Sequence, residues 1–284
     1  MTNVYSNIYL RPKALPHTWC PGCGHGIIIH GLVAAIDKLG LDQDRVVIVG
    51  GIGCSGRTAF MLDFNTMHTT HGRAIAFATG IKLVRPELTV ILTLGDGDAL
   101  AIGGNHFLHA ARRNIDLTAV IYNNSIYGMT GGQLAPTTPM GKRSVTAPHG
   151  GIEPSVDIVK LVIAAGATYV ARTTTFDFQE VPRLIERAIA HRGFSVVDIL
   201  TPCPTYYGRL NHPADPYQMI HEFKRMTVPV EEAESMTVEE LGDRWVTGEF
   251  VCEDRPEYTE LYRQMCRKMR PGEGKPSDDR SPRP

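Results

Sequence analysis

The chain has 284 residues, 43% of them hydrophobic, and a formal net charge of −1 at pH 7. This length and apolar content allow a large core, and the near-zero charge argues against nucleic-acid binding, which normally requires a basic stripe. No apolar run approaches the roughly 18 residues of a membrane span, and the first residues lack the basic and apolar regions of a secretory signal. We therefore expect a soluble, cytoplasmic protein that binds neither nucleic acid nor membrane.

The six cysteines indicate metal or redox chemistry more than disulfides. After an extended, proline-containing arm over Asn3–Trp19, Cys20 and Cys23 form a Cys-Pro-Gly-Cys motif in front of a buried helix predicted for residues 27–39. The motif fits a thioredoxin-like dithiol, a zinc site that needs two more ligands, or a purely structural role. The surrounding chain lacks the short βαβ order of a thioredoxin fold, and the motif alone leaves metal binding and a structural role equally open.

Two more cysteines follow predicted strands. The strand at residues 46–50 leads into a glycine loop that contains Cys54, and the strand at residues 195–200 is followed by Cys203. Because the carboxyl ends of parallel strands lie along one edge of a sheet, the four cysteines are expected to converge. Four thiolates suit either zinc or a [4Fe–4S] cluster.

A histidine-containing segment follows the glycine loop. Met67-His-Thr-Thr-His-Gly-Arg-Ala74 precedes small residues at near-helical spacing, which predict a helix that packs closely against a neighbour or a cofactor. Histidines such as His68 and His71 are more often structural than functional, and the same holds for His25 after the first cysteine pair.

The sequence Gly95-Asp96-Gly97 ends the strand predicted at residues 89–94 and precedes a helix. Glycines at 95 and 97 let backbone N–H groups approach an anion, and the helix N-terminus favours a phosphate. Asn124 follows the next strand, at residues 117–122, so that it and Asp96 offer two oxygen ligands beside a phosphate site. Each motif by itself is also compatible with an ordinary turn or strand exit, but together they indicate a magnesium–diphosphate site.

The loop after Asn124 is rich in glycine. The backbone N–H groups of Gly128, Met129 and Thr130 are expected to wrap the diphosphate, although a surface loop would have the same composition. Residues 136–151 then form an irregular excursion, interpreted as a lid or a subunit contact.

The fold class follows from alternating strands and helices. Strands near residues 46–50, 89–94, 117–122, 167–172 and 195–200, with helices that include 156–165 and 179–191, predict an α/β fold with a doubly wound, mostly parallel sheet. Residues 1–217 form this domain, and residues 218–284 form a helical or irregular extension. Its last ~14 residues are proline-rich and charged, and are expected to be disordered or bound to a partner.

The combined motifs resemble a known family. Gly-Asp-Gly followed by Asn123-Asn124 is similar to the signature of thiamine diphosphate enzymes. With Cys-Pro-Gly-Cys-Gly, Gly-Ile-Gly-Cys-Ser and a late Cys-Pro, the chain looks like the β subunit of the 2-oxoacid:ferredoxin oxidoreductases over residues 15–210. The resemblance implies the diphosphate-binding half of the thiamine fold. It implies Mg²⁺ held by the side chains of Asp96 and Asn124 and the carbonyl of Ile126.

The same resemblance implies one [4Fe–4S] cluster near the thiamine ring, held by Cys20, Cys23, Cys54 and Cys203. Cys252 and Cys266 fall outside the pattern and are expected to be free thiols. His71 and Arg73 are the candidate catalytic residues. The residues expected to bind the cofactor are His25, Gly53, Cys54, Ser55, His71, Gly95, Asp96, Gly97, Asp98, Asn124, Ile126, Gly128, Met129 and Thr130.

The implied reaction converts a 2-oxoacid, coenzyme A and oxidised ferredoxin into acyl-CoA, carbon dioxide and reduced ferredoxin, in principle reversibly. The glutamate that activates thiamine has no place in this single half, so we expect an obligate α subunit and an α2β2 assembly.

Trp19 and the first cysteine motif favour 2-oxoglutarate, converted to succinyl-CoA, over pyruvate or a branched-chain 2-oxoacid. Arg57, Arg73 and Lys82 are candidates to bind a second carboxylate. A non-redox thiamine decarboxylase or carboligase, and a zinc-stabilised binding subunit, are the alternatives from other classes.

Overall fold

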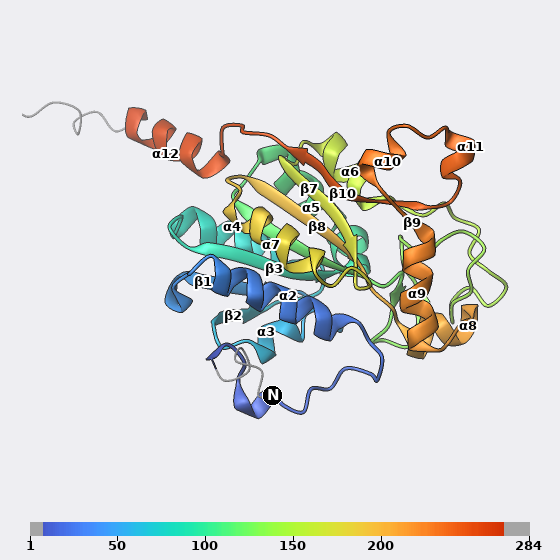
Figure 1. Cartoon of the computed structure of the whole chain (residues 1–284). Helices are drawn as coiled ribbons and strands as arrows, with labels where there is room; N and C mark the ends of the chain where they lie inside the picture. Colours follow the sequence, from blue (N-terminus) through green and yellow to red (C-terminus); the bar gives the residue numbers. More distant parts are fainter. Residues whose placement is uncertain (1–7, 270–284) are drawn as a thin grey trace, which may run out of the picture.

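A computed structural model of the chain describes residues 8–269 and contains one eight-stranded sheet (Figure 1). The strand order is β2-β1-β3-β4-β8-β7-β10-β9. The strands are β1 (Val46–Gly50), β2 (Asn65–His68), β3 (Thr89–Gly95), β4 (Leu117–Asn123), β7 (Tyr169–Thr174), β8 (Phe194–Leu200), β9 (Thr227–Pro229) and β10 (Trp245–Cys252), and β5 (Ile126–Tyr127) and β6 (Gln133–Leu134) form a separate hairpin.

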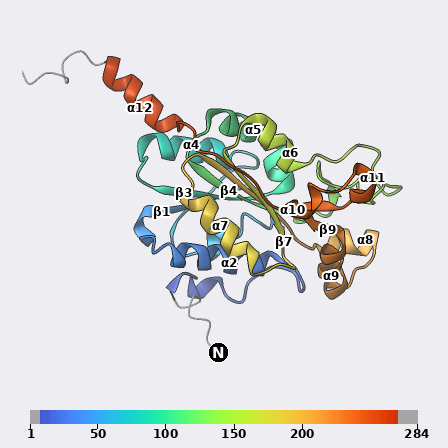
Figure 2. The ribbon, with the colours of Figure 1, turned by 45° about the horizontal axis from the view of Figure 1, so that its top comes forward.

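Helices cover both faces of the sheet (Figures 1 and 2). The α-helices are α2 (His25–Lys38), α3 (Thr58–Met61), α4 (Ala74–Val84), α5 (Gly104–Arg113), α6 (Ile158–Ala165), α7 (Glu180–Ala190), α8 (Arg209–Asn211), α9 (Pro216–Met226), α10 (Val230–Ala233), α11 (Val238–Leu241) and α12 (Tyr258–Met269). The short segments η1 (Pro12–Ala14) and η2 (Gln43–Arg45) are 3₁₀-helical, whereas η3 (Asp98–Ile102) and η4 (Pro204–Gly208) are π-helical. Among residues 8–269, no helix is both long and apolar enough to cross a bilayer.

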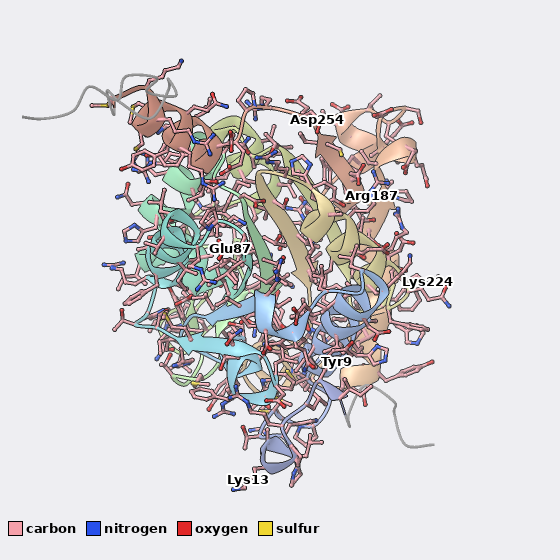
Figure 3. All side chains as sticks on the ribbon, turned by 90° about the vertical axis from the view of Figure 1, so that its left-hand side faces the viewer. Tyr9, Lys13, Glu87, Arg187, Lys224 and Asp254 are labelled. Carbon is pink, nitrogen blue, oxygen red and sulfur yellow. The ribbon has the colours of Figure 1, made fainter. Side chains whose placement is uncertain are left out.

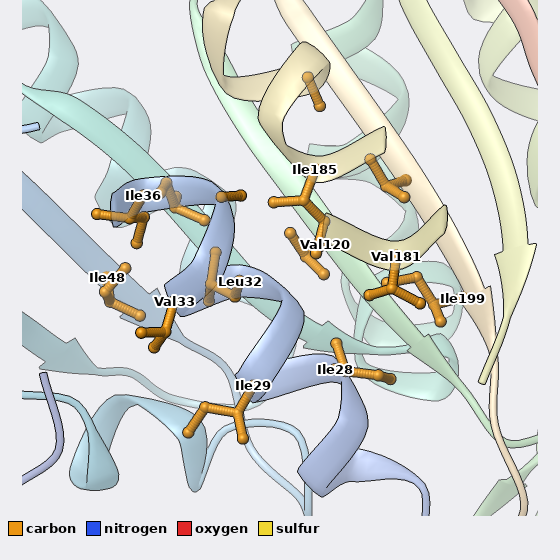
Figure 4. Packing of buried hydrophobic residues seen from close by; sticks show 14 of the residues in the cluster. Ile28, Ile29, Leu32, Val33, Ile36, Ile48, Val120, Val181, Ile185 and Ile199 are labelled. Atoms are coloured by element: carbon orange, nitrogen blue, oxygen red, sulfur yellow. The ribbon is translucent and has the colours of Figure 1, made fainter. Parts of the chain in front are cut away.

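The central strands are apolar along their whole length because both faces are covered. Every residue of β1, β4 and β8 is buried, which is the pattern of parallel strands between two helical layers. Alternate side chains enter opposite layers: Ile48 packs with α2 and α7, whereas Val47 and Val49 pack on the face of α4 and α5. Figure 4 shows the first layer, in which Leu32 of α2 and Ile185 of α7 lie in the same cluster.

The predicted doubly wound sheet is confirmed, and its five predicted strands are present within two residues of their expected ends. The sequence did not predict β2, β9 and β10. The two C-terminal strands extend the sheet beyond β7, which pairs antiparallel with β10, whereas a helical or irregular extension was expected after residue 217. The aromatic and β-branched residues of β10 are a strand signal, but Gly248 interrupts it and charged helices flank it.

A hydrogen bond at the surface joins the C-terminal strand β10 to helix α7. Arg187 of α7, which Figure 3 labels, donates to Glu249 of β10 over 2.8 Å. Beyond β10, α12 projects away from the body (Figures 1 and 2). The last ~14 residues, expected to be disordered or partner-bound, lie outside the described residues, as do the first residues of the predicted N-terminal arm.

Candidate functional site

The carboxyl ends of β1, β3 and β4 meet at one pocket. Every residue predicted to bind the cofactor lines it: His25, Gly53, Cys54, Ser55, His71, Gly95, Asp96, Gly97, Asp98, Asn124, Ile126, Gly128, Met129 and Thr130. Ile52, Tyr122 and Tyr127 also line the pocket and were not predicted from the sequence. The parallel register explains this convergence, because Gly50, Thr93 and Val120 lie side by side on the sheet and all three strands end at the same edge.

Asp96 is a buried carboxylate at the end of β3. The residue is only 2% exposed, and burial raises its pKa to about 7, although the Thr137 hydroxyl and the Gly97 backbone N–H act in the opposite direction. The hydroxyl of Thr137 donates to Oδ2 of Asp96. A divalent cation at this carboxylate would offset the cost of burying its charge, so the position fits the predicted magnesium ligand.

The second and third predicted magnesium ligands lie on a tight turn after β4. Ser125 has a left-handed backbone with φ 58°, and the backbone N–H of Ile126 donates to Oδ1 of Asn124 over 3.4 Å. The hydroxyl of Thr138 donates to the carbonyl of Ser125 over 2.7 Å and accepts from the N–H of Ala135. A side chain from the following segment therefore fixes the turn between Asn124 and Ile126.

Thr137 and Thr138 were missed as site residues in the sequence. They belong to the segment interpreted as a lid or a subunit contact, but the structure buries both hydroxyls beside predicted magnesium ligands. The sequence contained one signal that could have identified them: two consecutive threonines lie between prolines, shortly after the glycine-rich loop.

Asp98 and His71 form a pair at the edge of the pocket. Asp98 is 3% exposed, and its Oδ1 contacts Nδ1 of His71 and accepts the backbone N–H of Gly72 over 2.8 Å. The ring of Tyr127 meets that of His71 edge-on, with centroids 5.9 Å apart. These contacts fix the orientation of the imidazole in the pocket wall.

Two glycines make room for this pair and for the tyrosine. A Cβ on Gly51 would stand 1.8 Å from Oδ2 of Asp98, and one on Gly97 would stand 2.4 Å from the ring of Tyr127. The glycine at 97 was expected to allow close approach of an anion, and the structure shows that it also admits the Tyr127 ring. Side chains at either position would displace the pocket wall.

The four predicted cluster cysteines come together beside the pocket. A Cβ on Gly24 would stand 2.3 Å from Oγ1 of Thr201, so the first cysteine pair packs directly against the segment that carries Cys203. Burial raises the pKa of Cys23 to about 12, and the nearby thiols of Cys203, Cys54 and Cys20 act in the same direction. Four thiols that lie this close together stay protonated until a metal replaces their protons.

Backbone N–H groups are directed at two of these sulfur atoms. Burial raises the pKa of Cys203, and hydrogen bonds from the backbone of Tyr207 and Tyr206, within η4, partly offset this rise. A hydrogen bond from the backbone of His25 likewise lowers the pKa of Cys23 and partly offsets the effect of its burial. Amides directed at a sulfur stabilise a thiolate, which is the form that binds iron or zinc.

Single-ion sites and iron–sulfur clusters differ in the spacing of their ligands. Within the described part of the chain, no three His, Cys, Asp or Glu side chains are grouped as ligands of one metal ion. Tetrahedral zinc holds its sulfurs about 2.3 Å from one centre, whereas a cluster distributes them over separate irons. Cys252 and Cys266 lie on β10 and α12 and are free thiols.

The candidate cations for a second carboxylate lie outside the pocket lining. Arg73 donates to the carbonyl of Ile102 over 2.8 Å, and Arg57 donates to the carbonyl of Thr18 over 2.9 Å. Lys82 is buried and forms an ion pair with Asp116. All three therefore have structural partners, and of the two candidate catalytic residues only His71 lines the pocket, among the described residues.

A buried ion pair supports the strand next to the site. Arg172 of β7 donates to Oδ2 of Asp198 over 2.8 Å, and Oδ1 of Asp198 accepts from Asn123 over 3.0 Å. Arg172 also binds Asp157 and stacks over the ring of Trp245, 4.9 Å from its centroid. The pair joins β7, β8 and β4 immediately before Asn124, and no sequence motif had indicated it.

Comparison with known proteins gives consistent results. Residues 51–199 match the family described as thiamine pyrophosphate enzyme, C-terminal TPP binding domain. The 2-oxoglutarate synthase subunit KorB of Methanocaldococcus jannaschii is 47% identical over 262 residues, which are 92% of this chain and 97% of that protein. The 2-oxoacid:ferredoxin oxidoreductase β subunit of Saccharolobus solfataricus is 46% identical over 66% of this chain and 62% of its own length.

A solved structure agrees with these sequence relatives. The 2-oxoglutarate:ferredoxin oxidoreductase from Magnetococcus marinus, with 2-oxoglutarate, coenzyme A and succinyl-CoA bound, superposes with a TM-score of 0.84 at 33% identity. The match covers 97% of this chain and 94% of that one. The similarity therefore extends beyond the thiamine-binding region to nearly the whole chain.

Proposed function

We propose that this chain, which belongs to the family of 2-oxoacid:ferredoxin oxidoreductase β subunits that includes the 2-oxoglutarate synthase KorB subunits, places a thiamine–magnesium site beside one [4Fe–4S] cluster. The assembled enzyme converts 2-oxoglutarate, coenzyme A and oxidised ferredoxin into succinyl-CoA, carbon dioxide and reduced ferredoxin, and the reverse reaction fixes carbon dioxide. The 2-oxoglutarate and succinyl-CoA bound in the related structure support this choice of substrate over pyruvate or a branched-chain 2-oxoacid.

The position of Gly128 is the observation that carries the proposal. A Cβ on Gly128 would lie 3.5 Å from Sγ of Cys203, 4.0 Å from Sγ of Cys54 and 4.0 Å from Nδ2 of Asn124. Two predicted cluster ligands and one predicted magnesium ligand thus surround one residue of the glycine-rich loop. A group bound by its diphosphate at Asn124 is within reach of a cluster bound by these sulfurs.

The residues of the pocket have separate roles in this proposal. Thiamine diphosphate supplies the electron sink for decarboxylation, and the cluster accepts electrons. The oxygens of Asp96 and Asn124 and the carbonyl of Ile126 hold Mg²⁺, and the backbone N–H groups of residues 128–130 bind the diphosphate. His71, oriented by Asp98, presents its ring to the pocket as a contact to cofactor or substrate.

A partner subunit completes the site. Glutamate is absent from the described residues that line the pocket, so the group that activates the thiamine ring has to come from another chain. The names of the relatives, subunit KorB and subunit beta, support an α partner, and we propose an α2β2 enzyme. None of the six cysteines, all of which lie among the described residues, forms a disulfide, which fits a reducing compartment. We place the enzyme in the cytoplasm with ferredoxin as its electron acceptor.

The test is an anaerobic co-purification of this chain with its α partner. The expected complex contains thiamine and four irons per β chain, and it reduces a viologen dye with 2-oxoglutarate plus coenzyme A faster than with pyruvate or branched-chain 2-oxoacids. A complex that contains zinc in place of iron would contradict the redox function, and one that lacks thiamine would contradict the cofactor assignment. A preference for pyruvate would overturn the substrate choice alone.

The Asp96→Ala variant tests the magnesium site separately from the cluster. It is expected to lose thiamine and keep its iron, because Asp96 lies among the predicted magnesium ligands and outside the cysteine group. Asp63→Ala is the matched control, since Asp63 is a surface carboxylate whose ion pair with Arg11 is 3.7 Å long. Normal thiamine retention in Asp96→Ala would show that the magnesium assignment is wrong.

A further inference from the structure

His25 lies between the cysteine group and the cofactor pocket. Its Nδ1 is 3.2 Å from Sγ of Cys23, and the same side chain lines the pocket that contains Asp96. The residue is only 1% exposed. One buried imidazole therefore contacts a predicted cluster ligand and also borders the space expected to hold the thiamine.

Aromatic contacts fix the ring in this position. Its centroid lies 5.0 Å from that of Tyr122 and 5.6 Å from that of Trp19. The indole N–H of Trp19 donates to the carbonyl of Cys54 over 2.8 Å, and the Tyr122 hydroxyl accepts from Thr58 over 3.0 Å. The ring of His25 is thus held by neighbours that are themselves anchored, one of them to a second predicted cluster ligand.

The chemistry of an iron-bound cysteine identifies the donor in the contact. A cysteine that ligates iron is a thiolate and has no hydrogen to donate. The hydrogen between Cys23 and His25 then belongs to Nδ1 of the imidazole. A backbone hydrogen bond from His25 reaches the same thiol, so this sulfur receives two interactions from one residue.

Hydrogen bonds to cluster sulfurs change the reduction potential. An N–H donor stabilises negative charge on the thiolate, and the reduced cluster carries one more negative charge than the oxidised cluster. We propose that His25 is a positioning residue that raises the reduction potential of the [4Fe–4S] cluster by donating its Nδ1–H to Cys23. This inference rests on the proposed function, because it requires the cluster at these cysteines.

The test measures the midpoint potential of the cluster in the anaerobically purified complex, by dye-mediated titration followed by electron paramagnetic resonance. His25→Leu removes the donor. His25→Asn places an amide N–H near the position of Nδ1, whereas His25→Gln extends its amide toward the position of Nε2. His30→Leu is the matched control, because His30 lies on the same helix but is exposed.

We expect a shift to more negative midpoint potential in His25→Leu and His25→Gln, and a midpoint near that of the wild type in His25→Asn and His30→Leu. Iron-loaded His25→Leu and His25→Gln with the wild-type midpoint would overturn the inference. If His25→Leu loses its cluster, equal midpoints in the Asn and Gln variants would overturn it as well. A wild-type complex that contains no iron would contradict the cluster assignment and with it the proposed function. An unchanged midpoint potential in the iron-loaded variants would contradict only the role of His25.

Discussion

Thr137 donates its hydroxyl hydrogen to Oδ2 of Asp96, and both residues are buried at the carboxyl end of β3. The hydrogen bond crosses from the segment after the glycine-rich loop to the end of a central strand. It leaves the carboxylate with a fixed orientation in front of the position where Mg²⁺ is proposed to bind. The supporting residue is thus as much a part of the site as the ligand it orients.

The variant Thr137→Val should weaken the magnesium-dependent binding of thiamine diphosphate by about 10–100-fold, which is the usual effect of removing a group that supports a metal ligand. Thr137→Ser keeps the hydroxyl and should restore most of the affinity. Thiamine retained after gel filtration, measured against magnesium concentration, checks both variants. Thr79→Val on α4 is the control, because its hydroxyl bonds only within its own helix, to the carbonyl of Ile75. Equal affinity in Thr137→Val and the wild type would contradict the role of this hydrogen bond.

The variant Gly51→Ala should disrupt the pocket wall. The new Cβ would stand 1.8 Å from Oδ2 of Asp98, so either the carboxylate or the loop has to move and the contact with His71 is lost. We expect at least a tenfold loss of thiamine affinity, measured by the concentration of thiamine diphosphate that half-saturates the complex. Gly80→Ala, inside α4 with no heavy atom within 4 Å of its Cβ, should instead stabilise the fold by about 0.5–1 kcal/mol. A Gly51→Ala protein that binds thiamine normally would disprove the close packing around Asp98.

The variant Arg172→Met should lower the free energy of unfolding by about 3–5 kcal/mol, because it leaves the buried carboxylate of Asp198 without its cation. The double variant Arg172→Met, Asp198→Asn should recover a large part of this loss, since no unpaired charge remains. Urea unfolding at neutral pH measures both. A double variant that is as unstable as the sum of the two single variants would show that the charge pair is not the source of the effect.

The acid stability of the fold should depend on Glu257, which is 4% exposed in front of α12. Burial by itself would raise its pKa, but hydrogen bonds from the Thr259 hydroxyl and from the backbones of Thr259, Glu260 and Asp116 outweigh it, so the pKa is lowered from its ordinary value of 4.5. A carboxylate whose pKa is lowered by folding stabilises the folded state above about pH 4.5. That stabilisation is lost as the pH falls through the pKa of the folded state.

Replacing Glu257 by Gln should therefore destabilise α12 at pH 7 by about 1.5–3 kcal/mol and reduce the dependence of stability on pH below 4.5. Proteolysis at the basic residues of α12 at pH 7 reports the loosening of this helix, and urea unfolding between about pH 3 and pH 7 reports the pH dependence. Glu253→Gln is the control, because Glu253 is an exposed residue whose ion pair with Arg255 is 3.6 Å long. If both variants are cleaved at the same rate, the hydrogen bonds of Glu257 do not hold α12.

The sequence by itself determined the five central strands of the sheet and the edge at which the site lies. Continuous apolar runs predict strands that are covered on both faces, and the glycine and cysteine motifs come directly after these runs. Since parallel strands end at one edge, the residues that follow β1, β3, β4 and β8 had to gather there. Each strand and each motif could be recognised from a short stretch of sequence, and the parallel sheet then brings their ends together.

Only the tertiary structure decided which side chains support that edge. The hydrogen bonds of Thr137 to Asp96 and of Arg172 to Asp198 each depend on how separate segments pack in three dimensions. The partners of these two pairs are 41 and 26 residues apart in the sequence. Hydrogen-bond geometry is fixed within a few tenths of an ångström, and hydrophobic periodicity carries no information at that precision. The strand β10 was found only in the folded molecule for another reason, because Gly248 interrupts its strand signal and charged helices flank it.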